Sequence, residues 1–140
     1  IEADNNSNNH TAAPISNPTI KNLTLIGNNA GSENQAMKLR VGTKANFDNV
    51  VLSNFGTGFD VEHDEGVAFV ASGELKATRV KFDNIATKSK GTKTVPAGSP
   101  TGTKGETVDV SKIFTEDANA TGAGNGTATP TWAAGWTVGL

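Results

Sequence analysis

The segment NVVLSNF, at residues 49–55, decides the fold, because related segments precede and follow it in the chain. The earlier one is NLTLIG at 22–27, and the later one is TRVKFDNI at 78–85. Equivalent apolar positions are 27 residues apart between the first two copies and 30 residues apart between the second and third. Repeats of roughly 20 to 50 residues are typical of stacked structural units. The sequence therefore predicts a repeat architecture.

A second series of short segments is offset between the first. It consists of MKLRV at 37–41 and FDVEH at 59–63, and both alternate apolar and polar residues as a strand does. Short strands joined by turns rich in Gly and Asn, with a period near one coil, are typical of a β-solenoid. Asn22 and Asn49 occupy equivalent turns, so we expect their side chains to form a ladder between coils.

Composition agrees with one β-rich domain of modest core. The chain has 140 residues, of which 35% are hydrophobic and 6% aromatic, with 16 Gly and no Tyr. Its net charge is −2, with no basic patch, so nucleic acid is not an expected partner. The absence of Cys excludes disulfides and Cys-based zinc sites. No apolar run approaches the roughly 20 residues of a membrane helix, so no transmembrane segment is expected.

The pattern divides the chain into coils and a less regular remainder. We expect all-β coils at 1–87, including a further short strand at 67–71, and loop excursions with a carboxy-terminal cap at 88–140. Residues 88–106 are rich in Lys, Gly, Thr and Pro, and 117–131 are rich in Ala, Gly, Asn and Thr. These compositions predict long surface loops.

Two tryptophans stand near the end of the sequence, at Trp132 and Trp136. They are expected either to cover the open end of the solenoid, which otherwise exposes apolar surface, or to bind a sugar ring. The other end of the chain, at Ile1, reads like the middle of a strand. We therefore expect residue 1 not to be the start of the gene product.

Several motifs, taken in order, resemble one known group of proteins. They are IEADNN at 1–6, NPTIKNLTLIG at 17–27, MKLRVGT at 37–43, GFDVE at 58–62 and GWT at 135–137. Together they look like the carboxy-terminal third of bacterial β-helical surface proteins and lipoproteins of Bacteroidota and marine Gammaproteobacteria, mostly of unknown function. The resemblance implies a right-handed parallel β-helix, missing amino-terminal coils before Ile1, and export to the outer surface. It carries over no catalytic residue.

Acidic residues form the first candidate site. Alternation along a strand puts Asp60, Glu62 and Asp64 on one face, about 7 Å apart, where their charges repel unless they are solvated or bridged by a cation. Calcium, which binds through oxygen ligands, is the candidate cation, and a solvated outer face is the alternative.

The amino-terminal residues are a second candidate site of the same kind. Glu2, Asp4, Asn5 and Asn6 offer carboxylate and amide oxygens for calcium or a sugar hydroxyl. The alternative is an Asn-rich turn with no ligand.

Basic residues form the third candidate site. Lys38, Arg40, Arg79 and Lys81 are expected to point outward from strands, which gives the molecule a basic face. Enzymes of this fold that cleave uronate polymers use a basic residue as general base, which needs a lowered pKa and a cleft.

The histidines do not indicate a metal site. His10 and His63 are the only two, without zinc-ligand spacing, and His63 is expected at a strand end near the core.

These observations favour a non-catalytic structural or adhesive module of the cell surface, one that self-assembles into a layer or filament or binds another surface protein. The alternative is a carbohydrate-binding or lyase-like β-helix that acts on acidic polysaccharides. A protein that stays monomeric on cell surfaces contradicts self-assembly, whereas the alternative predicts binding or turnover of an acidic polysaccharide that is lost on changing Arg40 or Arg79 to Ala.

Overall fold

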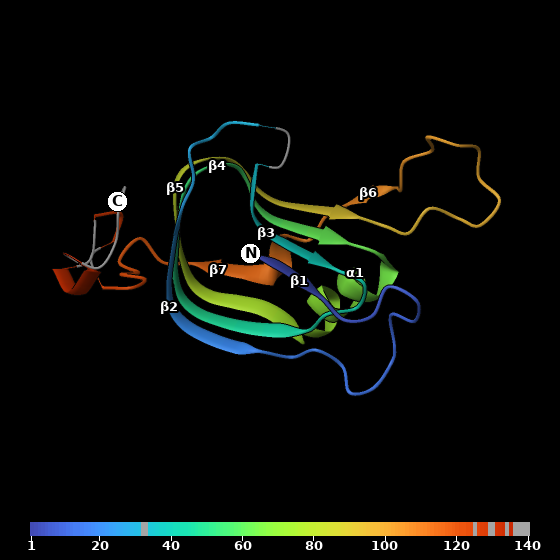
Figure 1. Ribbon diagram of the computed structural model, residues 1–140, viewed down its shortest axis with the longest axis horizontal. Coiled ribbons are helices and arrows are strands. Elements are labelled where there is room, and N and C mark those ends of the chain that lie inside the picture. Colours follow the sequence, from blue (N-terminus) through green and yellow to red (C-terminus); the bar gives the residue numbers. More distant parts are fainter. Residues whose placement is uncertain (32–33, 125, 129–130, 134, 136–140) are drawn as a thin grey trace.

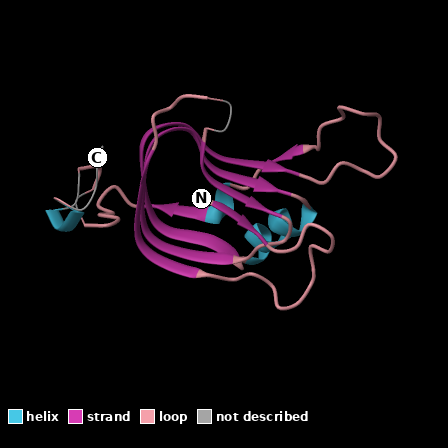
Figure 2. Cartoon of the chain, in the orientation of Figure 1, coloured by secondary structure: helices cyan, strands magenta, loops and turns pink. Residues whose placement is uncertain are grey.

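The computed structural model describes residues 1–31, 34–124, 126–128, 131–133 and 135. Strands make up most of its regular structure (Figure 2). In chain order the elements are β1 (Glu2–Asp4), β2 (Thr19–Ile26), β3 (Gln35–Arg40), β4 (Ala45–Glu62), α1 (Asp64–Ser72), β5 (Leu75–Thr92), β6 (Thr107–Val108), η1 (Ser111–Ile113), β7 (Phe114–Glu116) and η2 (Thr131–Ala133).

Successive coils stack with their strands parallel. Leu23 of β2 pairs with Val50 of β4, and Val50 pairs with Val80 of β5, which are the positions that the sequence repeat aligns. On another side of the coil, β1, β3 and the later parts of β4 and β5 pair in the same order (Figure 1). Strand β7 adds to β5 in parallel, and β6 adds to it antiparallel. The prediction of a parallel, all-β solenoid is confirmed.

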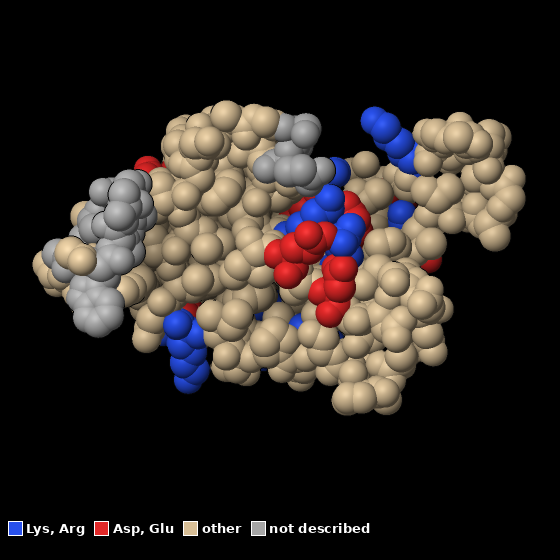
Figure 3. Space-filling model, in the orientation of Figure 1, with Lys and Arg blue, Asp and Glu red and all other residues tan. Residues whose placement is uncertain are grey.

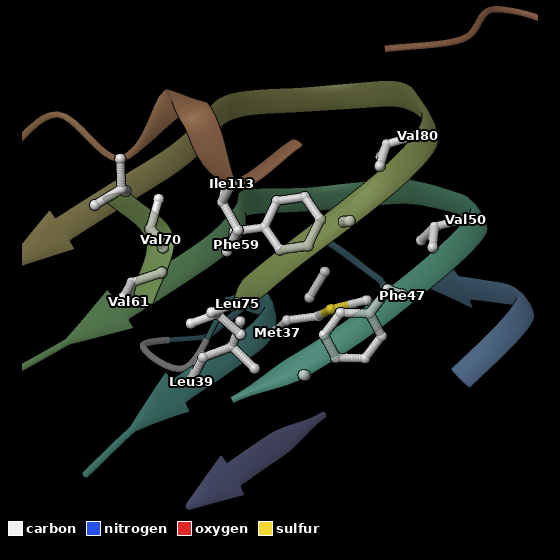
Figure 4. Packing of buried hydrophobic residues seen from close by; sticks show 14 of the residues in the cluster. Met37, Leu39, Phe47, Val50, Phe59, Val61, Val70, Leu75, Val80 and Ile113 are labelled. Carbon is white, nitrogen blue, oxygen red and sulfur yellow. The ribbon is translucent and has the colours of Figure 1, made fainter. Parts of the chain in front are cut away.

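The core lies inside the coils and is formed by the inward half of each alternating pattern. Phe47 and Phe59 of β4 are almost fully buried, as are Met37 and Leu39 of β3 (Figure 4). Each coil is too thin to bury these side chains alone, so the apolar contact between coils is the main stabilising term.

Asparagines turn the chain at the corners of the coils. Asn22 and Asn49 have left-handed φ angles of 56° and 57°, and Asn54 and Asn84 repeat this conformation at the next corner. Asn tolerates left-handed backbone better than most residues, which is why it recurs here. Asn49 Nδ2 donates to Asn22 Oδ1 at 2.8 Å, so the expected Asn ladder is present.

Residues 117–124, called the strap below, cross the outside of this corner. The backbone N–H groups of Thr121 and Gly122 donate to Asn49 Oδ1 at 2.9 and 3.2 Å. The N–H of Ala123 donates to Thr24 Oγ1 at 2.9 Å. The strap has no helix or strand, as its composition predicts, but Gly122 is buried against the coil.

The strand expected at 67–71 is instead part of α1. Asp64 and Glu65 place negative charge in its first turn, where it favours the helix dipole. Gly73, at φ 78°, ends the helix in left-handed conformation, and the N–H of Glu74 returns to Phe69 O at 2.9 Å. These end signals override the strand-like composition of the apolar run.

Strand β5 continues to Thr92, so the excursion expected from residue 88 begins only at Lys93. Beyond it, Val110 and Ile113 return to the core and are almost fully buried. Phe114 of β7 stacks on Phe59, with ring centroids 6.0 Å apart. In the part of the chain that the structure describes, no helix has the length and apolarity to span a membrane.

Candidate functional site

The densest array of charged side chains lies on the outer face of β1, β3 and the later parts of β4 and β5. We call it the charged face, and Figure 3 shows acidic and basic side chains gathered over β1 and β3. One row across the strands is formed by Glu2, Lys38, Asp60 and Lys90. In the adjacent row, Asp4 lies beside Arg40, and Glu62 beside Thr92. Charge therefore alternates from strand to strand.

Ion pairs link the strands of the charged face. Arg40 binds Asp4 through two hydrogen bonds, of 3.1 Å from Nε and 2.9 Å from Nη2, and it also pairs with Glu2. The Nζ of Lys38 lies 4.0 Å from Glu62 Oε1. Paired in this way, the basic side chains reach across the outside of β1, β3 and β4 and are held in place by carboxylates.

Asp60 is the buried member of the face, with 1% of its surface exposed. Gln35 Nε2 donates to its Oδ2 at 3.4 Å, and Lys90 Nζ lies 3.5 Å from Oδ1. Oδ1 itself has no hydrogen bond, although the ammonium of Lys90 opposes its charge. A buried carboxylate is costly unless it is paired, and the contacts with Gln35 and Lys90 offset part of that cost for Asp60.

An open groove of about 490 Å³ lies on this face, at the edge formed by β1 and β3. Its lining residues are Ile1, Glu2, Gln35, Lys38 and Arg40. Amide, ammonium, guanidinium and carboxylate groups thus meet around one hollow, which offers both donors and acceptors to a polar ligand.

The hydrogen bond from Arg40 to Asp4 raises the pKa of the Arg40 guanidinium above its ordinary value. At another part of the coil, Arg79 binds Asp48 at 2.9 and 2.7 Å, and this bond likewise raises the pKa of Arg79. The same contact lowers the pKa of Asp48 to about 2. Both arginines are therefore held firmly in the charged form.

The structure distributes the basic residues named from the sequence over two places. Lys38 and Arg40 line the groove on β3. Arg79 and Lys81 lie on β5, beside the segment of β4 that precedes its second corner. They do not form one continuous basic face.

The acidic triplet is likewise divided. Asp60 and Glu62 share the outer face of β4, as alternation predicted, but Asp64 is the first residue of α1. Asp64 Oδ1 accepts a hydrogen bond of 3.3 Å from the N–H of Thr94. Within the described residues, no group of three or more His, Asp or Glu side chains is placed to hold a metal ion.

The amino-terminal set separates in the same way. Glu2 and Asp4 face Arg40, whereas Asn5 closes the loop that follows β1. Asn5 Nδ2 donates to the carbonyls of His10 and Ala12 at 3.0 and 3.1 Å. Asn6 Oδ1 accepts from the N–H groups of the turn that follows it, as in an Asn-rich turn.

Trp132 is 69% exposed, and its Nε1 donates to Ala123 O at 3.5 Å. It is not part of the buried core, which includes Val110 and Ile113 and against which Phe114 packs. Trp136 lies outside the described residues.

Sequence reasoning missed a cluster formed by the two histidines. His10 Nδ1 lies 2.9 Å from Glu65 Oε2, and the rings of His10 and His63 meet edge to face with centroids 4.7 Å apart. The hydrogen bond from His10 lowers the pKa of Glu65. No periodicity signals this contact, because His10 lies in an irregular loop and Glu65 in the helix.

The family comparison agrees with this architecture. A family model described as a pectate-lyase-like beta helix domain matches residues 1–137. Neither the curated proteins nor the solved structures gave a match. The match covers nearly the whole chain, and the parallel coils are those expected of such a domain, so the chain belongs to the pectate-lyase-like beta helix domain family.

Proposed function

We propose that the chain is a non-catalytic module of a secreted or outer-surface β-helix protein and that it adheres to polysaccharide through the charged face. In this proposal the coils wind right-handed, and η1 with β7 caps their carboxy-terminal end. The observation that carries the proposal is the pairing of the basic residues of the face with carboxylates, around an open groove.

The pairing argues against a lyase. A general base that removes a proton beside a uronate carboxylate must lose its own proton near neutral pH. The contacts of Arg40 and Arg79 raise their pKa values, which is the opposite direction. Binding needs no such deprotonation, so the same side chains suit adhesion.

The balance of charge favours a neutral glycan over an acidic one. Among its described side chains the face carries the carboxylates of Glu2, Asp4, Asp60 and Glu62 against the basic groups of Lys38, Arg40 and Lys90. An acidic polymer meets no excess of positive charge there, so long-range attraction does not draw it in. Sugar hydroxyls, which both donate and accept, match the mixture of groups around the groove.

The test is retention of the protein on a panel of neutral and acidic polysaccharides, measured by affinity gel electrophoresis. We expect retention on a neutral polymer, and a loss of roughly tenfold in affinity for Arg40→Ala, since charge-assisted hydrogen bonds contribute about 1.5–3 kcal/mol. Arg79→Asn is the matched control, because Arg79 also binds an aspartate but lies away from the groove, and Asn tolerates the left-handed φ of 53° at this position.

Two results would overturn the proposal. One is an absence of retention on every polymer of the panel. The other is the release of unsaturated uronate ends, seen as ultraviolet absorbance, which demonstrates lyase catalysis.

A further inference from the structure

Trp132 is the most exposed of the large apolar side chains that the structure describes. Its exposed fraction is 69%, against 52% for Ile26, 43% for Ile1 and 37% for Val95. Trp side chains are highly buried on average, so an indole this exposed is unusual and is accessible to a ligand. Its exposure suits the second of the two roles expected from the sequence, which is contact with a sugar ring.

The segment that carries Trp132 is anchored to the rest of the molecule. Ala133, the next residue of η2, is only 1% exposed, and the indole Nε1 donates to Ala123 O at 3.5 Å. The N–H of Ala123 in turn donates to Thr24 Oγ1 of β2 at 2.9 Å. A side chain that is positioned before a ligand arrives loses less conformational freedom on binding, which favours affinity.

The chain around Trp132 carries no charge. Residues 118–140 contain no Asp, Glu, Lys, Arg or His. The exposed polar residues that the structure describes in this segment are Asn119, Thr121, Thr127 and Thr131. A charged polymer meets no opposite charge in the segment, whereas sugar hydroxyls find hydroxyl and amide groups with which to form hydrogen bonds.

One exposed ring is too small a surface for a protein partner. Stable protein–protein interfaces bury about 800 Å² on each partner around an apolar centre. Among the residues that the structure describes between 118 and 135, Trp132 is the only apolar side chain larger than Ala. A flat ring among small polar residues instead matches the flat C–H face of a single sugar ring, whose hydroxyls point outward from its edge.

We propose that Trp132 stacks on the C–H face of one sugar ring of a neutral polysaccharide. The choice of ligand class rests on the proposed glycan adhesion. In Figure 1, η2 lies at the left, beyond the corners of β2 and β5, whereas β1 and β3, which line the groove, lie near the middle. The stacking contact is therefore a second site, separate from the groove.

The experiment titrates the full chain with soluble neutral hexasaccharides of glucose, xylose and mannose. The chain has two Trp, so in Trp136→Phe the fluorescence reports Trp132 alone. We expect a saturable change in its emission, because stacking replaces water at the ring. In calorimetry we expect Trp132→Ala to weaken affinity roughly tenfold and Trp132→Phe, which keeps a smaller ring, roughly threefold.

Val95→Ala is the matched control. It also removes exposed apolar surface, but from the loop between β5 and β6, which lies on the opposite side of the molecule from η2 (Figure 1). We expect it to bind the hexasaccharides like the wild type. Trp132→Ala is expected to keep the melting temperature of the wild type, because most of the ring is already exposed to water.

The proposal is overturned if no hexasaccharide changes the emission, or if folded Trp132→Ala binds as well as the wild type. It is also overturned if the wild type forms a dimer in analytical ultracentrifugation that Trp132→Ala abolishes, since the ring then contacts a second copy. Binding that Arg40→Ala retains and Trp132→Ala loses supports the stacking contact, even if adhesion at the groove fails. Polysaccharide retention that Arg40→Ala weakens and Trp132→Ala leaves unchanged supports the groove and overturns the stacking contact.

Discussion

Asn49 combines two roles at one corner, since it turns the chain and holds the strap. Its side chain accepts from Thr121 and Gly122 and is only 7% exposed. We expect Asn49→Ala to lower the free energy of unfolding by about 2–4 kcal/mol, because Ala tolerates left-handed backbone poorly and removes the acceptor of the N–H groups of Thr121 and Gly122. Urea denaturation measures this.

Asn84 provides the matched control for that change. It has nearly the same φ, 50°, but is exposed, and its Nδ2 makes one bond of 2.8 Å to Asn54 Oδ1. We expect Asn84→Ala to cost about 1–2 kcal/mol, mostly from the backbone. Equal costs at the two positions would show that the strap contributes nothing through Asn49.

The lowered pKa of Asp48 predicts how the stability of the protein depends on pH. Its pKa is lowered to about 2, first by the hydrogen bond from Arg79 and then by that from Thr78. Because the pKa is lower in the folded state, the contacts of ionised Asp48 stabilise the folded protein at pH values above the unfolded pKa, near 4. This stabilisation is lost as the pH falls from there to about 2. Carboxyl NMR titration of Arg79→Asn, which keeps a residue tolerant of left-handed backbone, should return this pKa toward its ordinary value.

Asp109 is the internal reference for that titration. The backbone N–H of Ser111 lowers its pKa, and Arg79 takes no part in that contact. The pKa of Asp109 should therefore stay unchanged in Arg79→Asn. If the pKa of Asp48 also stays near 2, the ion pair is not its cause.

At the scale of elements, alternation was enough to place most strands but not to exclude a helix. The run at 67–71 is too short for periodicity to distinguish strand from buried helix. The signals that decide it lie outside the run, in the acidic first turn and in Gly73. Val51 interrupts the alternation between Val50 and Leu52, because Gly122 of the strap lies against its Cγ2 and buries its outer side.

The segment of η1 and β7 packs against the buried core, and Ile113 is its most buried side chain, with 0% exposed. We expect Ile113→Ala to reduce the free energy of unfolding by about 2–5 kcal/mol through the cavity that it leaves. Chemical denaturation tests this against Lys112→Ala, an exposed neighbour in the same turn, which should change stability by no more than about 0.5 kcal/mol. Similar small effects for both would mean that η1 does not stabilise the coil.

For the whole molecule, the sequence was sufficient to find the repeat but not the partners of the charged residues. Outward positions such as Lys38 and Asp60 follow from alternation alone. Which charged side chains pair depends on the register of the strands, and the coils differ in the length of the connections between their strands. The chain between Ile26 of β2 and Gln35 of β3 corresponds to a shorter stretch of continuous strand in β4, and the turn at 41–44 corresponds to the longer 63–74 with α1. The spacing of 27 and then 30 residues reflects both changes, so it could not predict the ion pairs.

The same register determines whether calcium can bind the charged face and raise the melting temperature of the protein. A ligand that binds only the folded state raises the melting temperature. Asp60 lies beside Lys90 and Glu62 beside Lys38, whereas Asp64 lies in α1 and not on the strand, so the three carboxylates do not converge. We therefore expect scanning calorimetry to give the same melting temperature in millimolar calcium and in chelator. A rise in calcium that disappears in Glu62→Gln would instead establish a cation site on this face, with the Lys38 pair giving way to the ion.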